Sequence, residues 1–192
     1  MRQLYSLIIG MLLLCSCALT HQDLILRPDV NVAKSDIGKG RAVKFKTVDE
    51  RNSSVVGSRG VKGFASADIV VTTQDATAVI QTTLVDGLKQ KGFSPILQEG
   101  SFNYGLRVDI RNLEYGITPG IITGTLRTEA VLKATCTVDG KNLYDQMYRG
   151  EETDWILVAQ FSESNEKYIN SALSKAIQNL LDDPKLQECL AQ

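Results

Sequence analysis

The stretch TLRTEAVLKATCTVDG, residues 125–140, decides the fold class of this chain. Apolar and polar residues alternate along residues 126–138, a pattern typical of a β-strand with one buried and one solvated face. The pair Asp139 and Gly140 that follows is a favoured two-residue hairpin turn. We therefore predict a long strand that folds back onto a second long strand.

The turn also predicts which residues of the second strand face outward. Counting back from it places Tyr144 and Tyr148 on the outer face of the sheet, and both are candidate contacts for a partner. The same register places Asp145 on the inner face, opposite Ala134. A carboxylate at that position indicates either a β-bulge or an inner face that is not fully dry.

The remaining secondary structure is predicted from periodicity. Residues 41–48 and 106–110 alternate as strands do, with Val43, Phe45 and Thr47 facing inward in the first. One amphipathic helix ends at Lys91, before Gly92, and a second runs from Ser162 to Leu181. The glycine-rich residues 52–65 are predicted as a mobile loop. This order predicts an α+β fold, with a single antiparallel or mixed β-sheet and two helices packed on one face.

The N-terminus has the pattern of an export signal. Arg2 precedes an apolar run, Leu4 to Leu14, that is shorter than the ~20 residues needed to cross a membrane. The following motif LCSC, residues 14–17, resembles the lipobox of bacterial lipoproteins. The resemblance implies that Cys17 is acylated and becomes the first residue of the mature chain, and that Ala18 after it favours outer-membrane sorting. Simple cleavage near Ala18, which would give a soluble secreted protein, is the alternative.

These observations divide the chain into three parts. Residues 1–16 are the predicted lipoprotein signal peptide, residues 17–39 a lipidated, flexible tether, and residues 40–192 a single periplasmic α+β domain. With 21 basic and 22 acidic residues the formal net charge is -1, which argues against a nucleic-acid partner.

Catalytic and metal-binding patterns are scarce in the sequence. The single histidine, His21, lies in the predicted tether, which excludes a His-based catalytic pair or zinc site within the domain. Glu151, Glu152 and Asp154 could bind a divalent cation, but a solvated acidic strand end is the preferred interpretation. No cofactor and no metal is predicted.

Cys136 and Cys189 are the two cysteines that follow the predicted signal and anchor. An oxidising periplasm would allow a disulfide between them. Cys136 is also expected on the inner face of a strand, where a thiol commonly serves as a small buried apolar group. Both possibilities stay open at the level of sequence.

Two apolar segments are candidates for an interaction surface. The tip GITPGIITG, residues 116–124, carries Ile117, Ile121 and Ile122 between two long strands. If exposed, these isoleucines would form a partner contact; the alternative is that they fold back onto the core. The segment WILVAQF, residues 155–161, is predicted to pack into the core.

Taken together, these features resemble the YajG-like family of uncharacterised bacterial lipoproteins. The resemblance is carried by the signal with residues 14–17, the helix ending in residues 91–93, paired strands around residues 130–148, and the closing helix 165–181. It implies an outer-membrane lipoprotein but transfers no binding or catalytic residue. A more distant likeness is to lipoproteins that regulate peptidoglycan synthases or assist transport and secretion complexes.

We therefore expect a non-enzymatic periplasmic lipoprotein, anchored to the outer membrane through Cys17. It would act by contact with an unidentified envelope protein, in envelope maintenance or as an accessory of an envelope assembly. The alternative is a protein that binds lipid or glycan during envelope transport. An apolar cavity between helices and sheet would favour that alternative.

Overall fold

The computed structural model describes residues 22–61, 65–70, 73–98, 100, 102–119, 123–157 and 162–192. These residues form eight strands and three helices, in the order β1 (Gln22–Asp23), β2 (Ala42–Asp49), β3 (Val55–Val61), β4 (Ala65–Val70), α2 (Thr73–Gln90), β5 (Ser94–Ile96), β6 (Tyr104–Pro119), β7 (Thr123–Val138), β8 (Lys141–Leu157), α3 (Ser162–Leu181) and α4 (Pro184–Ala191).

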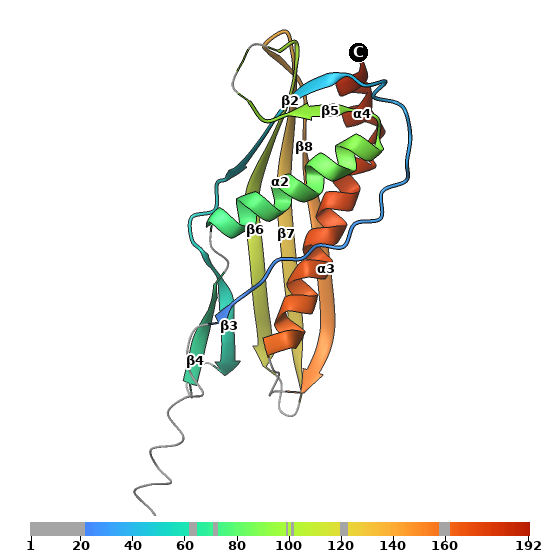
Figure 1. The fold of residues 1–192 in the computed structure, drawn as a ribbon. Coiled ribbons are helices and arrows are strands. Elements are labelled where there is room, and N and C mark those ends of the chain that lie inside the picture. Colours follow the sequence, from blue (N-terminus) through green and yellow to red (C-terminus); the bar gives the residue numbers. More distant parts are fainter. Residues whose placement is uncertain are drawn as a thin grey trace, which may run out of the picture.

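All the strands belong to one mixed sheet (Figure 1). Its body is the antiparallel meander of β6, β7 and β8. Strand β2 lies parallel to β6 and to the short β5. Farther along the same edge of β6, β3 meets it in parallel at Gly57, and then pairs with β4. The predicted single-sheet α+β fold is confirmed.

The helices cover one face of this sheet (Figure 1). The predicted apolar stripe of α3 is fully buried, from Ile169 to Leu180, and the predicted inward residues Val43, Phe45 and Thr47 of β2 are buried too. Helix α3 packs on β7 and β8, α2 packs on β2 and β5, and α4 covers the end of the sheet near the β7–β8 turn. The interface is filled by large side chains that are less than 2% exposed: Ile69, Ile80, Leu84, Leu106, Ile110, Leu126, Leu132, Ile169, Leu173, Ile177 and Leu180.

The β7–β8 hairpin forms as predicted, but a bulge changes its register. Thr137 pairs with Asn142, whereas Cys136 already pairs with Tyr144, so Leu143 is the extra residue. Beyond the bulge every side chain of β8 is on the face opposite to the one that the turn alone predicts. Asp145 is therefore exposed, and its carboxylate lies 2.8 Å from the Lys133 ammonium.

The prediction of a loop over residues 52–65 is wrong for the residues of β3. Val55–Val61 form a strand because β4 and β6 supply hydrogen-bonding edges for it. Gly57, one of the glycines in this segment, allows close packing instead. A Cβ atom added to Gly57 would lie 2.0 Å from the carbonyl oxygen of Tyr115.

The folded domain also begins earlier than predicted. Residues 24–40, here called the strap, run across α3 (Figure 1). The side chains of Leu24, Leu26 and Val32 are buried in the core. The predicted domain boundary at residue 40 is therefore wrong, because the alternating apolar residues of the strap have helices to pack against. Residues 17–21 of the predicted tether, with Cys17 and His21, lie outside the described residues.

A disulfide links the sheet to the last helix. Cys136 on β7 and Cys189 on α4 are bonded, at a sequence separation of 53. Of the two possibilities left open by the sequence, the structure has the bonded pair. Closing a loop of this length stabilises the folded state by about 4 kcal/mol in the chain-entropy description.

Candidate functional site

The main accessible surface of the sheet is the face of β6, β7 and β8 that none of the described helices covers, here called the outer face. Side chains alternate along each strand, so Arg127 and Glu129 point outward between the buried Leu126, Thr128 and Ala130. The outer face also carries exposed apolar groups, notably Met147 on β8. Long polar strands that are left open on one side are a natural place for a partner to bind.

Three glutamates form a row across this face. Glu114 on β6 lies opposite Glu129 on β7, which lies opposite Glu151 on β8. Like charges in directly opposed positions repel one another and destabilise a sheet unless other groups compensate.

Nearby amide and guanidinium groups supply that compensation. The Asn112 side-chain nitrogen donates to Glu114 at 3.3 Å and to Glu129 at 3.1 Å. Arg149 pairs with Glu129 at 3.0 Å and with Glu151 at 3.6 Å. The row is therefore a network of charges on rigid strands, exposed at Glu114 and Glu151 and suited to polar recognition of a partner surface.

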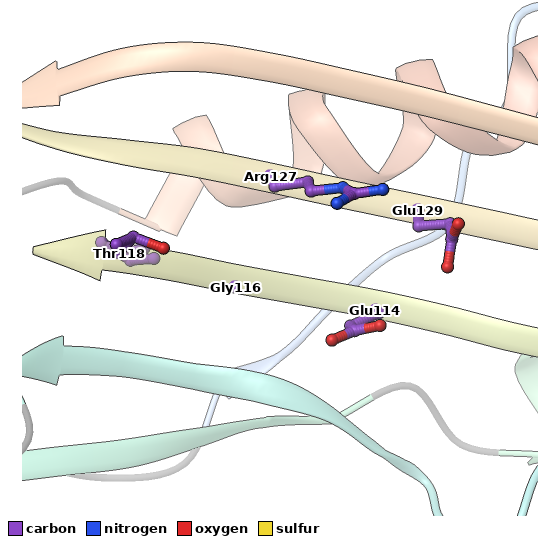
Figure 2. A pocket seen from close by; sticks show the side chains of 6 residues that line it. Glu114, Gly116, Thr118, Arg127 and Glu129 are labelled. Atoms are coloured by element: carbon purple, nitrogen blue, oxygen red, sulfur yellow. The ribbon is translucent and has the colours of Figure 1, made fainter.

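A hollow of roughly 300 Å³ lies beside this row, and its lining residues are Glu114, Gly116, Ile117, Thr118, Arg127 and Glu129. Figure 2 shows Arg127 and Glu129 on β7, with Glu114 and Thr118 on the neighbouring β6. The hollow exists because Gly116, directly opposite Arg127, has no side chain. Arg127 keeps 62% of its side chain exposed while pairing with Glu151 at 3.4 Å. Its guanidinium can therefore bind an acceptor group of a partner without first being released from the core.

The predicted tip does not form an exposed cluster within the described residues. Ile117 is half-buried and packs against the hydrophobic core. Ile121 and Ile122 lie outside the described residues. The interpretation of Ile117 as an exposed contact is wrong, because its side chain faces the helix layer with Leu126, its partner on β7.

The two tyrosines predicted as outer-face contacts are on the inner face. Because of the bulge at Leu143, Tyr144 and Tyr148 point toward α4, and both hydroxyls donate to Asp183, the Tyr144 hydroxyl at 2.8 Å. Tyr148 is buried. Their assignment as partner contacts is corrected: they hold α4 against the sheet. The sequence signal that could have shown this is the poor inner-face position that the turn register gives to Asp145.

Asp183 is the acceptor at the centre of this arrangement and is also the N-cap of α4, accepting from the Lys185 amide at 2.9 Å. Partial burial by itself would raise the pKa of the Asp183 carboxyl. Hydrogen bonds from Tyr148, Tyr144 and the amides of Lys185 and Leu186 outweigh it and hold this pKa below its usual value. Burial, and then the hydrogen bond to Asp183, raise the pKa of Tyr148. Both hydroxyls therefore stay protonated as donors.

The acidic residues weighed as a cation site point to two different faces. Glu151 is in the outer-face row, whereas Glu152 accepts from Ser171 at 2.7 Å and from Lys175 at 2.6 Å on α3. These hydrogen bonds lower the pKa of Glu152. Asp154 accepts from the Tyr168 hydroxyl. Over the described parts of the chain, no group of three His, Cys, Asp or Glu side chains is placed to hold a metal ion.

The prediction that residues 155–161 pack into the core is wrong for the one tryptophan of the chain. Trp155 lies near the end of β8 on the outer face and is 76% exposed. Phe161, the last residue of the segment, lies outside the described residues. An exposed indole is unusual, because a tryptophan side chain contributes a large apolar area when it is buried.

In the described residues, none of the helices is both long enough and apolar enough to span a bilayer. Comparison with known protein families matches residues 28–191 to a family described as uncharacterised lipoproteins. The chain belongs to this lipoprotein family. The predicted membership of the YajG family is thus confirmed. A comparison of this lipoprotein with curated protein sequences gives no match.

Several solved structures are similar to this lipoprotein. A protein from Xanthomonas campestris has 12% sequence identity and a TM-score of 0.54, with 84% of this chain and 91% of that chain covered. A neuraminyllactose-binding hemagglutinin homolog from Helicobacter pylori has 10% identity and a TM-score of 0.49, with 87% and 97% covered. A minor lipoprotein from Acinetobacter baumannii has 10% identity and a TM-score of 0.46, with 79% and 90% covered. At these identities the likeness concerns the fold alone.

Proposed function

We propose that this lipoprotein is a non-enzymatic periplasmic protein, held at the outer membrane by acyl chains on Cys17, that binds another envelope protein through its outer face. The observation that carries the proposal is the arrangement on β6–β8. Arg127 and two glutamates line a hollow there, further arginine–glutamate pairs lie beside it, and Met147 is exposed on the same face. An interface of this composition has a polar rim and a few apolar contacts, as transient protein complexes do.

The polar groups of the described residues support contact rather than catalysis. Two carboxylates that accept several hydrogen bonds, Asp183 and Glu152, join helices to the sheet. The chain has one histidine, His21, and it precedes the described part of the domain. A general base such as histidine positioned beside a nucleophile is the usual requirement for acyl transfer.

Binding of a lipid or glycan inside the domain is less well supported. A protein with that function is expected to have an apolar cavity between its helices and sheet. In this protein, large buried side chains fill the interface. Hollows lined by described residues open at the surface, beside the strap and on the outer face. We therefore favour a role in contact with another protein.

The anchor is tested by replacing Cys17 with alanine. The Cys17→Ala protein is expected to leave the membrane fraction, because no other residue can supply the acylated amino terminus. Density-gradient separation of inner and outer membranes then tests the sorting of the native protein. Retention of the variant at the native level would contradict the lipid anchor.

The contact surface is tested by photocrosslinking in intact cells. A photoreactive amino acid in place of Met147, exposed on the outer face, should give a discrete crosslinked product. The same amino acid in place of Lys89, exposed on α2 with 61% of its side chain accessible, is the control for the helix side. Equal products from both positions, or none from Met147, would contradict the outer face as the binding surface.

A further inference from the structure

The end of the sheet that carries Trp155 is also the end from which the N-terminal segment leaves the domain. Gln22 pairs with Ile69, Ile69 with Gly57, and Gly57 with Tyr115 of β6, so these residues form one row across the sheet. The last paired row of β6–β8, at Pro119, lies four residues beyond Tyr115, or about 13 Å along the strand.

The direction of β1 determines the side to which the preceding residues extend. Strand β1 is parallel to β4, β4 is antiparallel to β3, and β3 is parallel to β6. Strand β1 therefore runs opposite to β6, and the chain before Gln22 leaves toward the Pro119 row. Figure 1 shows β3 and β6 ending at the same end of the molecule.

Buried hydrogen bonds hold this exit point in place. The Tyr115 hydroxyl donates to the Asn165 side-chain oxygen at 2.7 Å, and the Asn165 amide nitrogen donates to the Gln22 side-chain oxygen at 3.0 Å. Asn165 and Gln22 are both buried. The chain that precedes Gln22 is therefore attached to the domain at a rigid point on the sheet and α3.

The chain between Cys17 and Gln22 is too short to hold the domain far from a bilayer. Five residue steps separate Cys17 from Gln22 and span at most about 17 Å when fully extended. That reach exceeds the 13 Å to the end of the sheet by only a few ångströms. An acyl chain on Cys17 would therefore bring the Pro119 end of the sheet to the membrane surface, with the strands steeply inclined to it.

The side chains on this end of the outer face suit a membrane interface. Thr118, Thr125 and Trp155 form one row across β6, β7 and β8. On the described outer face from that row to the end of the sheet, the side chains carry no charge, whereas the glutamate row and its arginines lie farther back. Tryptophan is enriched at membrane interfaces, where its ring is partly in apolar surroundings and its N–H remains hydrated.

We propose that the Trp155 end of the sheet rests on the bilayer surface, with the indole of Trp155 in the interfacial layer of the phospholipid leaflet that holds the Cys17 anchor. This orientation rests on the proposed lipid anchor. It leaves the charged middle of the outer face and the β7–β8 turn in the periplasm, where a protein partner can reach them. The exposure of Trp155 in the isolated domain then has a physical reason, since its apolar surroundings are lipid.

The test uses the fact that Trp155 is the one tryptophan of the chain. Mature lipidated protein is reconstituted into vesicles of phosphatidylethanolamine and phosphatidylglycerol, with or without phosphatidylcholine brominated on its acyl chains. Trp155 emission should shift to shorter wavelength in vesicles, and the brominated lipid should reduce its intensity.

A matched variant moves the tryptophan to the far end of the same strand. Leu143 is also exposed, and it lies twelve residues before Trp155 in β8, roughly 40 Å away. In the double variant Trp155→Phe with Leu143→Trp, emission should stay at long wavelength and brominated lipid should leave it unchanged. Equal quenching at both positions would overturn the proposed orientation.

Vesicle flotation separates this proposal from the anchor on which it rests. Protein that floats with intact acyl chains while Trp155 emission stays unshifted and unquenched overturns the orientation and leaves the anchor standing. Native mature protein that is isolated from cells without acyl chains and does not float overturns both. A shift that occurs in native envelopes but not in pure lipid assigns Trp155 to a protein partner and also overturns the proposal.

Discussion

At the scale of single residues, Asp183 shows how one carboxylate joins two elements. Its side chain caps α4 and accepts hydrogen bonds from Tyr144 and Tyr148 of β8. The bulge at Leu143 allows this, because it turns both tyrosines toward the helix. The two residues that the hairpin pattern offers as binding contacts therefore stabilise the fold.

The lowered pKa of Asp183 predicts a pH-dependent stability. Its carboxyl has a lower pKa in the folded than in the unfolded chain. The resulting stabilisation is present above the unfolded pKa, about 4, and is lost as pH falls through the folded pKa. Asp183→Asn, which keeps a capping oxygen, should lower the free energy of unfolding by about 1–3 kcal/mol at pH 7. In urea titrations the difference from the native protein should shrink below about pH 4.

The control for this measurement is Asp139→Asn. Asp139 is exposed in the hairpin turn with φ 49, a left-handed conformation that asparagine adopts readily. This variant should unfold with nearly the native free energy at every pH tested. If the difference in unfolding free energy between Asp183→Asn and the native protein stays constant from pH 7 to pH 3, the ionised Asp183 carboxylate does not stabilise the domain as proposed.

At the scale of elements, the contact between α3 and β8 depends on one missing side chain. A Cβ atom added to Gly150 would lie 1.9 Å from the carbonyl oxygen of Ala172 and 2.6 Å from the amide nitrogen of Ala176. The helix backbone thus lies directly on the strand. The side chains of Lys175 and Asn179 donate hydrogen bonds of 3.0 Å each to carbonyl oxygens of β8. They thereby satisfy backbone acceptors on the edge of β8 that does not pair with β7.

Gly150→Ala should therefore destabilise the domain by about 1–3 kcal/mol or more, because backbone atoms cannot yield as flexible side chains do. Gly116→Ala on β6 is the matched control. The nearest atom to its added Cβ is the Arg127 carbonyl oxygen at 3.9 Å, an ordinary contact distance. Thermal unfolding of the two variants compares them directly. Similar melting temperatures would show that α3 does not pack on β8 as described.

At the scale of the whole molecule, the strap joins regions that are distant in sequence. The side chain of Asn170 on α3 accepts from the Arg27 amide at 2.6 Å and donates to the Ile25 carbonyl oxygen at 3.1 Å. The Asp29 amide donates to Ser174 at 2.8 Å. The far end of the strap bonds to the end of α2, where the Gly40 amide donates to the Gly92 carbonyl oxygen at 2.7 Å.

Loss of the Asn170 side chain should loosen the strap without unfolding the domain. Two hydrogen bonds of about 0.5–1.5 kcal/mol each are removed in Asn170→Ala, so exchange protection of the Arg27 amide should fall by roughly tenfold or more. Lys167→Ala, at an exposed position of α3, is the control and should leave that protection unchanged. Unchanged protection in Asn170→Ala would indicate that apolar burial of Leu24 and Leu26 alone holds the strap.

The sequence by itself determined the features that depend on local periodicity and local chain chemistry. The inward face of β2, the buried stripe of α3 and the hairpin turn at Asp139 were all predictable. So were the bounds of α3, Ser162–Leu181, because its apolar residues repeat with the period of a helix. These signals were sufficient for the α+β class and for family membership.

The tertiary structure alone decided the features that depend on distant partners. Tyr148 turns inward because Asp183, 35 residues away, accepts its hydroxyl. Residues 24–40 become part of the domain because α3, more than 140 residues away, offers Asn170 and Ser174. Trp155 stays exposed because its register on β8 directs it away from the helices. A one-residue change of register reverses the face of every following side chain, and non-local hydrogen bonds and packing determine that register.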